Sequence, residues 1–296
     1  MTQLVELQRI HEQLDDAGYK VFAISNDSVD RLSTFAAQHN VTISLLSDED
    51  SAVIRRFGIL NTLIEPHEGR SMKWYGIPFP GTYIVGADGL ITDKIFDQHH
   101  ARRPSGNTLL HRVTGAIPPG DDGNTPLDAA ASADSEVTAR VRLSDPHLRL
   151  EVISTLIIDV QIAAGRHIYG DGAPDEFTPA RLTVTGDGIR CDPPHWPAPA
   201  TLTYQALGIN VPVYSENFTI TVPITATSSL NRLGHGLERD AVDIQISLTF
   251  QSCDDLSCSL PSTLALPTRL PLALLVEPAG LATYAERVRS EAPADQ

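Results

Sequence analysis

Hydrophobic side chains recur at helical spacing at the start of the chain and then form short apolar runs. Residues 4–17 repeat apolar side chains at intervals of three and four, and Gly18 follows where helices commonly end. Runs at 19–25 and 41–46 predict strands, and between them a helix is expected from the N-cap at Ser28 to about Gln38. Strands that alternate with helices indicate an α/β fold with parallel strand pairs.

The next segments complete this first unit. Residues 47–57 predict a short helix, and the strands at 82–85 and 90–96 are separated by a turn that contains Asp88-Gly89, which predicts a hairpin. We therefore expect the first unit to cover residues 1–98. Residues 99–136 are rich in Pro, Gly, Ala and Ser and predict a linker, with one short helix around Leu109.

The pattern changes after the linker, because short alternating segments between Gly and Pro turns replace the helical periodicity. This predicts an all-β sandwich over residues 137–276. Its clearest strand is 243–251, where every second residue from Ile244 to Phe250 is apolar. For the tail at 277–296 we expect one terminal helix.

Composition and charge narrow the class of protein. With 296 residues and 42% hydrophobic content, two globular units are the default expectation. The net charge of −15 and only 22 Lys plus Arg argue against nucleic acid as a partner. No apolar run reaches the roughly 18 residues of a membrane span. The N-terminus lacks a signal peptide, so the sequence as written predicts a cytoplasmic protein, or one of the cell envelope or periplasm if the true start lies upstream.

The candidate chemistry lies in a pair of cysteines, Cys253 and Cys258, between the strand at 243–251 and a second strand at 262–266. Four intervening residues can form a hairpin loop that sets the cysteines opposite each other, at about 4.5–5.5 Å between Cα atoms, which a disulfide tolerates. Closing so short a loop removes little chain entropy, which favours a bond that opens and closes over a stabilising one. We therefore expect Cys253 and Cys258 to be the catalytic residues.

Asp254 and Asp255 follow the first cysteine directly. Carboxylates oppose the formation of a neighbouring thiolate, so we expect the pKa of Cys253 not to be strongly depressed. Such a pair exchanges slowly with small molecules and quickly with a docked partner.

Two other interpretations of the pair stay open. One is a structural disulfide, and the other is a zinc site completed by Cys191 and His195, although neither spacing matches the usual Cys-x2-Cys ligand arm. Taken alone, Cys191 is expected to be an inert, half-buried thiol.

Other polar clusters are weaker candidates. Asp171, Asp175 and Glu176 could bind calcium, but their spacing fits no EF-hand and a solvated turn is the simpler interpretation. His99-His100 with Arg102-Arg103 could bind an anion, or be merely exposed. No motif for a nucleotide, a catalytic zinc or a serine nucleophile occurs, so we expect neither a metal nor a cofactor.

The second unit resembles the N-terminal, immunoglobulin-like domain of the bacterial transmembrane thiol:disulfide interchange reductase. The resemblance rests on His167-Ile-Tyr169, on the prolines around Trp196 and above all on the motif at 248–261, and it covers most of 140–270. Related modules read Tyr-Gln-Ala-Cys where this chain has Phe250-Gln-Ser-Cys. The resemblance implies that the two cysteines of the motif shuttle between dithiol and disulfide, with a thioredoxin-like or other dithiol/disulfide protein as partner.

Residues 3–97 resemble the alkyl hydroperoxide reductase and thiol-specific antioxidant group of thioredoxin-fold proteins, the redoxins. The matching pieces are Gln3–Gln8, Ala23–Ser28, Leu45–Asp48, and Pro80–Val85 with Asp88-Gly89. The resemblance implies that Pro80 is the cis-proline that faces the redox centre of this fold, with Thr82 close to it.

This sequence departs from the redoxin pattern at its start. In the family, a loop with the reactive cysteine precedes the first helix seen here, whereas Met1 occupies that place and residues 1–190 contain no cysteine. The first strands of the fold are also missing, which leaves a sheet edge unpaired. Either the sequence begins too late, or the unit is a degenerate redoxin that binds or scaffolds.

These observations predict a thiol-disulfide oxidoreductase that exchanges electrons through Cys253 and Cys258. One alternative is a thiol-dependent peroxidase whose peroxidatic cysteine lies upstream of Met1. Another is a redox-inactive binding module with a structural disulfide. The direction of electron flow and the identity of the attacking cysteine stay open.

Overall fold

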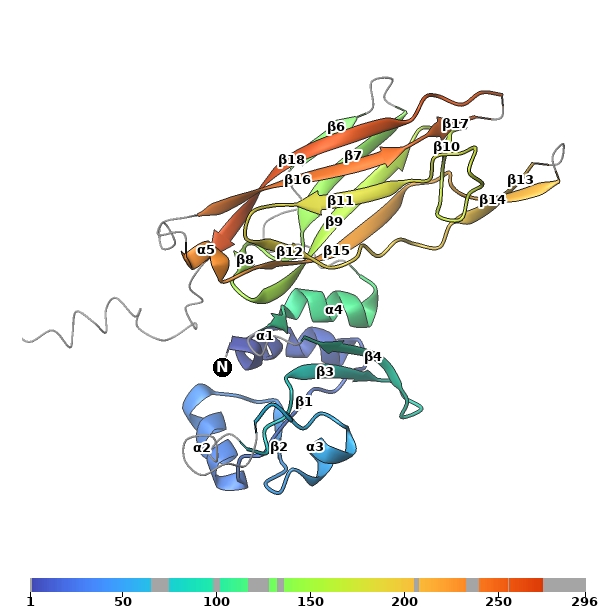
Figure 1. Cartoon of the computed structure of the whole chain (residues 1–296). Coiled ribbons are helices and arrows are strands. Elements are labelled where there is room, and N and C mark those ends of the chain that lie inside the picture. The colour runs from blue at the N-terminus through green and yellow to red at the C-terminus, as the bar shows by residue number, and fades with distance from the viewer. Residues whose placement is uncertain are drawn as a thin grey trace, which may run out of the picture. The chain divides into compact units, whose positions relative to one another are not determined.

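The computed structural model (Figure 1) describes residues 2–64, 75–97, 102–116, 128–131, 136–204, 208–232, 240–254 and 256–273. The described residues divide into two compact units, one within residues 1–100 and one within residues 101–274. Three predictions lie outside the described residues: the helix in the tail, the pair His99-His100, and the role of Asp255.

The first unit contains the helices and strands that the periodicity predicts. Both strand pairs are confirmed: β1 and β2 are parallel, and β3 and β4 form an antiparallel hairpin. The elements are α1 (Thr2–Asp16), β1 (Phe22–Ser25), α2 (Val29–His39), β2 (Ser44–Ser47), α3 (Ala52–Arg56), β3 (Gly81–Val85) and β4 (Ile91–Phe96).

Local chemistry explains the bounds of α2. The Ser28 hydroxyl accepts a hydrogen bond from the Arg31 backbone N–H and so caps the start of the helix. Asn40 ends it in the left-handed conformation with φ 51°, which Asn tolerates better than most residues.

The described strands of the first unit form two separate two-stranded sheets, β1-β2 and β3-β4. Large apolar side chains stay exposed on these elements, with Phe22 of β1 62% exposed and Ile91 of β4 50% exposed. The described strands of this unit therefore leave sheet edges and apolar side chains exposed.

The prediction of a cis peptide bond before Pro80 is wrong. No cis peptide bond occurs among the described residues, which include Phe79 and Pro80. The trans form of an X-Pro bond is favoured by about 0.5–1 kcal/mol unless its surroundings lock the other isomer. Pro80 directly precedes β3, in which Thr82 pairs with Ile95 of β4.

Part of the predicted linker belongs to the second unit. The helix expected around Leu109 is α4 (Gly106–Thr114), and its Leu109 and Leu110 are buried. The hydroxyl of its N-cap, Ser105, donates to the Asp145 carboxylate over 2.8 Å. Within the former linker, β5 (Arg103–Pro104) pairs with β9 and β6 (Asp128–Ala131) pairs with β7. A boundary at 137 is therefore too late.

The second unit is strand-rich, as expected, and its described strands form three sheets. One has the order β12-β15-β9-β7-β6 with β5 on β9, the second β11-β16-β18-β8, and the third β13-β14-β10-β17. Its remaining elements are β7 (Val137–Leu143), β8 (Leu148–Arg149), β9 (Val152–Ile162), β10 (His167–Tyr169), β11 (Arg181–Thr185), β12 (Ile189–Cys191), β13 (Ala200–Tyr204), β14 (Ile209–Tyr214), β15 (Phe218–Ala226), α5 (Ser229–Arg232), β16 (Ala241–Phe250), β17 (Ser252–Cys253) and β18 (Ser262–Ala273).

The first two sheets share one hydrophobic core. Ile158 of β9 and Ile220 of β15 contribute from one sheet, and Ile246 and Phe250 of β16 from the other, each at most 1% exposed. The alternation predicted for 243–251 is confirmed, because every second side chain of β16 is buried. The result is a β-sandwich.

The third sheet carries the cysteine motif. Its strand β17 follows β16 after one residue and pairs with β10, with Cys253 opposite His167. Tyr169, Val211, Val213 and Cys253 form a second, smaller core there. In the part of the chain that the structure describes, no helix is long and apolar enough to cross a membrane.

Candidate redox site

Cys253 and Cys258 form a disulfide. Cys253 ends β17, and Cys258 faces it across an antiparallel bridge in the loop before β18. Their Cα atoms are 4.1 Å apart. The predicted hairpin loop is therefore confirmed, with the cysteines slightly closer than in a regular ladder.

The two sulfurs differ sharply in their surroundings. Cys253 is 0% exposed within the smaller core, whereas Cys258 lies on the surface. Leu256 and Leu260 flank the exposed cysteine and are 96% and 87% exposed. An incoming thiolate can therefore reach Cys258, while the sulfur of Cys253 is shielded.

Asp254 shapes the loop between the cysteines. Its Oδ1 accepts hydrogen bonds from the backbone N–H groups of Leu256 and Ser257 over 2.8 and 2.7 Å. These bonds are the main reason that the pKa of Asp254 lies below its usual value, and the charge of Arg166 lowers it further. The carboxylate thus stays ionised and holds the loop. The expectation for the Cys253 pKa stays a prediction.

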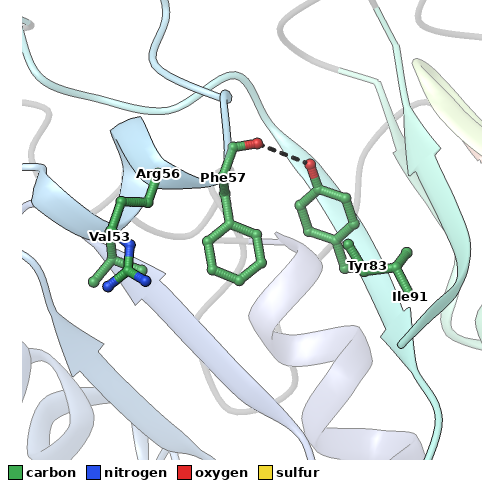
Figure 2. Close-up of a pocket in the computed structure, with 5 residues that line it drawn as sticks. All are labelled: Val53, Arg56, Phe57, Tyr83 and Ile91. Atoms are coloured by element: carbon green, nitrogen blue, oxygen red, sulfur yellow. Dashed lines mark hydrogen bonds between the residues drawn. The ribbon is translucent and has the colours of Figure 1, made fainter. Parts of the chain in front are cut away.

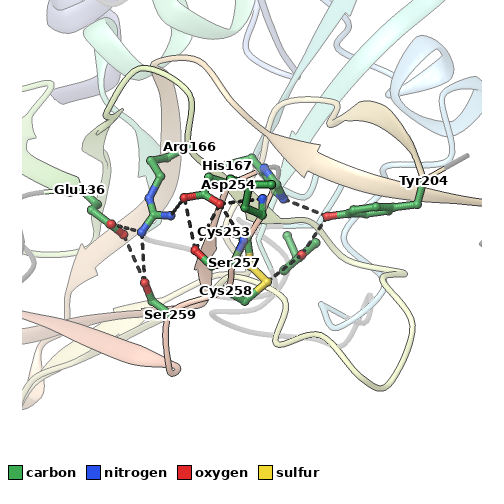
Figure 3. A network of polar contacts seen from close by, with 11 residues as sticks. Glu136, Arg166, His167, Tyr204, Cys253, Asp254, Ser257, Cys258 and Ser259 are labelled. Atoms are coloured by element: carbon green, nitrogen blue, oxygen red, sulfur yellow. Dashed lines mark hydrogen bonds and ion pairs between the residues drawn. A yellow bond between two sulfur atoms is a disulfide. The ribbon is translucent and has the colours of Figure 1, made fainter. Parts of the chain in front are cut away.

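Arg166 connects this loop to the sandwich, as Figure 3 shows. Its guanidinium donates to Asp254 over 2.8 Å, to Ser259 over 3.2 Å, and to Glu136. The Arg166 side chain is only 14% exposed, so these contacts are partly shielded from solvent. One cation therefore holds both ends of the segment from Asp254 to Ser259.

Replacing Arg166 with Met is expected to loosen the loop. Without the guanidinium, the carboxylates of Glu136 and Asp254 lose their shared cation, and the hydrogen bonds to Leu256 and Ser257 open more often. Hydrogen exchange of these two amides should accelerate by about tenfold, since the net contribution of a hydrogen bond to a charged group is roughly 1.5–3 kcal/mol.

A matched control is Arg142→Met, which removes an arginine that pairs with Asp159 over 2.7 Å elsewhere in the same unit. This variant should leave the exchange of Leu256 and Ser257 unchanged. Equal exchange rates in both variants would show that Arg166 does not hold the loop.

Aromatic rings and one histidine line the other side of the disulfide. The Tyr169 hydroxyl lies 3.5 Å from the Cys258 sulfur and 3.1 Å from the Tyr204 hydroxyl, which in turn lies 3.2 Å from His167 Nε2. Phe177 packs on Tyr169 with ring centroids 4.4 Å apart. Burial above all, and the contact with Tyr204, raise the pKa of Tyr169 far above its usual value, so its hydroxyl keeps its proton.

The weaker candidates do not form sites in the described structure. No group of three or more His, Cys, Asp or Glu side chains comes together as metal ligands among the described residues. Cys191 is half-buried on β12, and burial raises the pKa of its thiol to about 11, with Asp192 adding to the effect. The backbone of His195 pairs with Thr221.

A cavity of about 460 Å³ lies in the first unit, between α3 and the β3-β4 hairpin (Figure 2). Five side chains line it, and the Tyr83 hydroxyl donates to the Phe57 carbonyl over 3.4 Å. The lining contains no nucleophile, so it offers no centre for thiol chemistry. The lining residues are Val53, Arg56, Phe57, Tyr83 and Ile91.

Sequence reasoning found the cysteines but missed the residues around them. His167 and Tyr169 entered only as part of a resemblance, and Arg166, Phe177 and Tyr204 did not enter at all. Arg166 and Asp254 are 88 positions apart, so no local spacing indicates their contact. One usable signal was the pair of ring side chains His167 and Tyr169, two positions apart and shortly after an apolar strand.

Each of the two units matches a known family. Residues 1–94 match the AhpC/TSA family, and residues 151–268 match the family "Thiol:disulfide interchange protein DsbD, N-terminal". The first part of the chain is thus redoxin-like, and the second part resembles a thiol:disulfide interchange domain that here holds a disulfide.

Individual curated relatives match a part of this chain. Peroxiredoxin Bcp of Escherichia coli (strain K12) is 31% identical over 90 residues, which are 29% of this chain and 51% of that protein. A putative peroxiredoxin bcp of Coxiella burnetii is 30% identical over 83 residues, 28% of this chain and 52% of that protein. The chain therefore spans about half the length of the curated relatives it matches.

Two solved structures also show similarity. The N-terminal periplasmic domain of ScsB from Proteus mirabilis has a TM-score of 0.35 at 15% identity, over 50% of this chain and 52% of that one. The reduced N-terminal domain of DsbD from Neisseria meningitidis has a TM-score of 0.25 at 13% identity, over 40% of this chain and 82% of that one.

Proposed function

We propose that this chain is a thiol-disulfide oxidoreductase that exchanges electrons with a dithiol or disulfide protein through Cys253 and Cys258. One observation carries the proposal: the disulfide joins an exposed cysteine, Cys258, to Cys253, which is 0% exposed. When only one cysteine of a disulfide is accessible, a partner thiolate can attack the bond only at that cysteine. The match of 151–268 to an interchange domain supports the same chemistry.

The reaction proceeds through a mixed disulfide. A partner thiolate attacks the sulfur of Cys258, a new sulfur–sulfur bond forms, and the electron pair of the old bond leaves on Cys253. The second partner thiolate then attacks the partner sulfur and releases Cys258. The partner becomes a disulfide and the chain a dithiol, and the reverse sequence oxidises the chain.

Exposed leucines support a protein as the partner. Leu256 and Leu260 flank the accessible sulfur on a loop that Asp254 and Arg166 hold in place. Large apolar side chains beside a reacting atom gain free energy when a partner surface covers them. We propose a thioredoxin-like protein as this partner.

The test mixes the oxidised full chain with reduced thioredoxin and follows the Cys253–Cys258 bond by alkylation and mass mapping. We expect the bond to be reduced far faster by thioredoxin than by an equal concentration of dithiothreitol. A disulfide that stays intact with both reagents would establish a structural bond and dismiss the proposal.

Of the two compartments expected from the sequence, the cell envelope suits the proposal better. Disulfides persist in oxidising compartments and are rare in the cytosol. Separation of cell fractions, followed by detection of the chain, tests this placement.

A second candidate function is thiol-dependent peroxide reduction, which the match of residues 1–94 to AhpC/TSA proteins favours. This chemistry needs a thiolate, and residues 1–190 contain no cysteine. The candidate therefore requires a cysteine outside the printed sequence. Hydrogen peroxide consumption by a chain extended upstream tests it, and a rate no higher than that of the printed chain would dismiss it.

A further inference from the structure

A chain of hydrogen-bonding side chains ends at the reacting sulfur. His167 Nε2, the Tyr204 hydroxyl, the Tyr169 hydroxyl and the Cys258 sulfur follow one another at 3.2, 3.1 and 3.5 Å. His167 and Tyr169 lie two positions apart on β10 and are 6% and 0% exposed. Alternate residues of a strand share one face, so the backbone itself aligns these two side chains.

These hydrogen bonds are all donated in one direction, toward the sulfur, because of the hydrogens that each group carries. A disulfide sulfur carries no hydrogen, so any hydrogen bond between Tyr169 and Cys258 must be donated by the tyrosine. Each hydroxyl has one hydrogen, so Tyr169 must then accept from Tyr204. Tyr204 in turn must accept from His167, which requires a proton on Nε2.

We propose that His167, Tyr204 and Tyr169 form a proton relay that serves Cys258 during disulfide exchange. The proposal rests on the exchange function above and adds the source of the proton. Tyr169 touches the reacting sulfur, and Tyr204 and His167 act through it.

The relay acts when the mixed disulfide is resolved. The bond between the partner sulfur and Cys258 breaks, and its electron pair leaves on Cys258. The Tyr169 proton then passes to that sulfur, the Tyr204 proton to Tyr169, and the Nε2 proton of the His167 imidazolium to Tyr204. Cys258 ends as a thiol, both tyrosines keep their protons, and His167 ends neutral with its proton on Nδ1.

The reverse transfer starts the opposite reaction, in which the chain reduces a partner's disulfide and is itself oxidised. Neutral His167 takes a proton through the two tyrosines from the Cys258 thiol, and the resulting thiolate attacks a partner disulfide. Histidine suits both directions, because its unperturbed pKa lies near neutrality. The charged side chains nearest to this site in the described structure are Arg166, Asp254 and Glu136, and Arg166 pairs with each of the two carboxylates.

Three substitutions in the full chain test the relay, and each removes one of its proton transfers. Tyr169→Phe removes the donor to the sulfur, so exchange with thioredoxin should slow by about a hundredfold, the lower end of general acid–base effects. The midpoint of Cys258 alkylation by iodoacetamide should also move to higher pH. Tyr204→Phe interrupts the relay, and His167→Gln keeps an N–H donor that cannot transfer a proton.

The thiol of thioredoxin itself titrates near about pH 7, so each rate is first divided by the thiolate fraction of thioredoxin. For Tyr204→Phe and His167→Gln we then expect a flat exchange rate between about pH 5 and 8, where histidine titrates, against a sloping rate in the unaltered chain. The control is Tyr214→Phe, which removes a hydroxyl that donates to the Pro197 carbonyl and should keep the sloping profile. Retention of that profile by Tyr204→Phe and His167→Gln would overturn the relay while leaving the exchange function intact. An unaltered chain that fails to exchange at all would overturn both.

Discussion

Replacing Cys253 with Ser is expected to turn the chain into a trap for its partner, whereas Cys258→Ser should trap almost nothing. In the first variant the exposed thiol of Cys258 stays available, and no second thiol remains to resolve a mixed disulfide. In the second, the remaining sulfur of Cys253 is 0% exposed in the smaller core. Since exchange requires access to the attacking sulfur, we expect at least about a tenfold difference in trapping rate.

The measurement uses a thioredoxin with a single active-site cysteine, activated as a disulfide with thionitrobenzoate. Attack by the variant releases thionitrobenzoate, and the trapped complex is visible on a non-reducing gel. Cys191 is present in both variants and serves as an internal control for unspecific reaction. Equal trapping by both variants would show that exposure does not select Cys258.

Phe250→Ala is expected to cause the largest loss of stability among single truncations near the site. Phe250 is 1% exposed, ends β16 and packs in the core that the two facing sheets share. Removing a buried phenyl ring deletes its transfer free energy and leaves a cavity, which typically costs about 3–5 kcal/mol of unfolding free energy. Hydrogen exchange of the β16 amides at rising urea concentration measures this loss for the second unit specifically.

Leu256→Ala is the matched control, because it truncates an apolar side chain that is 96% exposed. Its unfolding free energy should stay within about 0.5 kcal/mol of the unaltered chain. If Phe250→Ala also stayed within that range, the shared core would not include the end of β16.

Most helices and hairpins of this chain follow from local patterns. The cap at Ser28, the hairpin at β3 and β4, and the alternation of β16 each depend on residues close in sequence. The place of α4 does not, because its cap bonds to Asp145, 40 positions away. A polar, proline-containing stretch around such a helix therefore predicts a linker when no tertiary contact is known.

The candidate site likewise combines residues that are close in sequence with residues that are far apart. The cysteine pair and its loop are contiguous, so spacing and turn geometry indicate the disulfide. The groups that surround it come from other strands: Tyr169 and Cys258 are 89 positions apart, and Tyr169 and Tyr204 are 35 apart. Which aromatic side chain reaches the sulfur depends on the pairing of β10 with β14 and β17, and no single segment encodes that pairing.

The reduction potential of the Cys253–Cys258 pair in the full chain tests the central claim most directly. The chain is equilibrated with dithiothreitol redox buffers, the thiols are alkylated, and the fraction of disulfide is determined by mass. Structural disulfides typically lie below about −300 mV, whereas exchange proteins lie between about −270 and −120 mV. A redox-active pair should fall in the higher range, and a value below about −300 mV would contradict an exchange function.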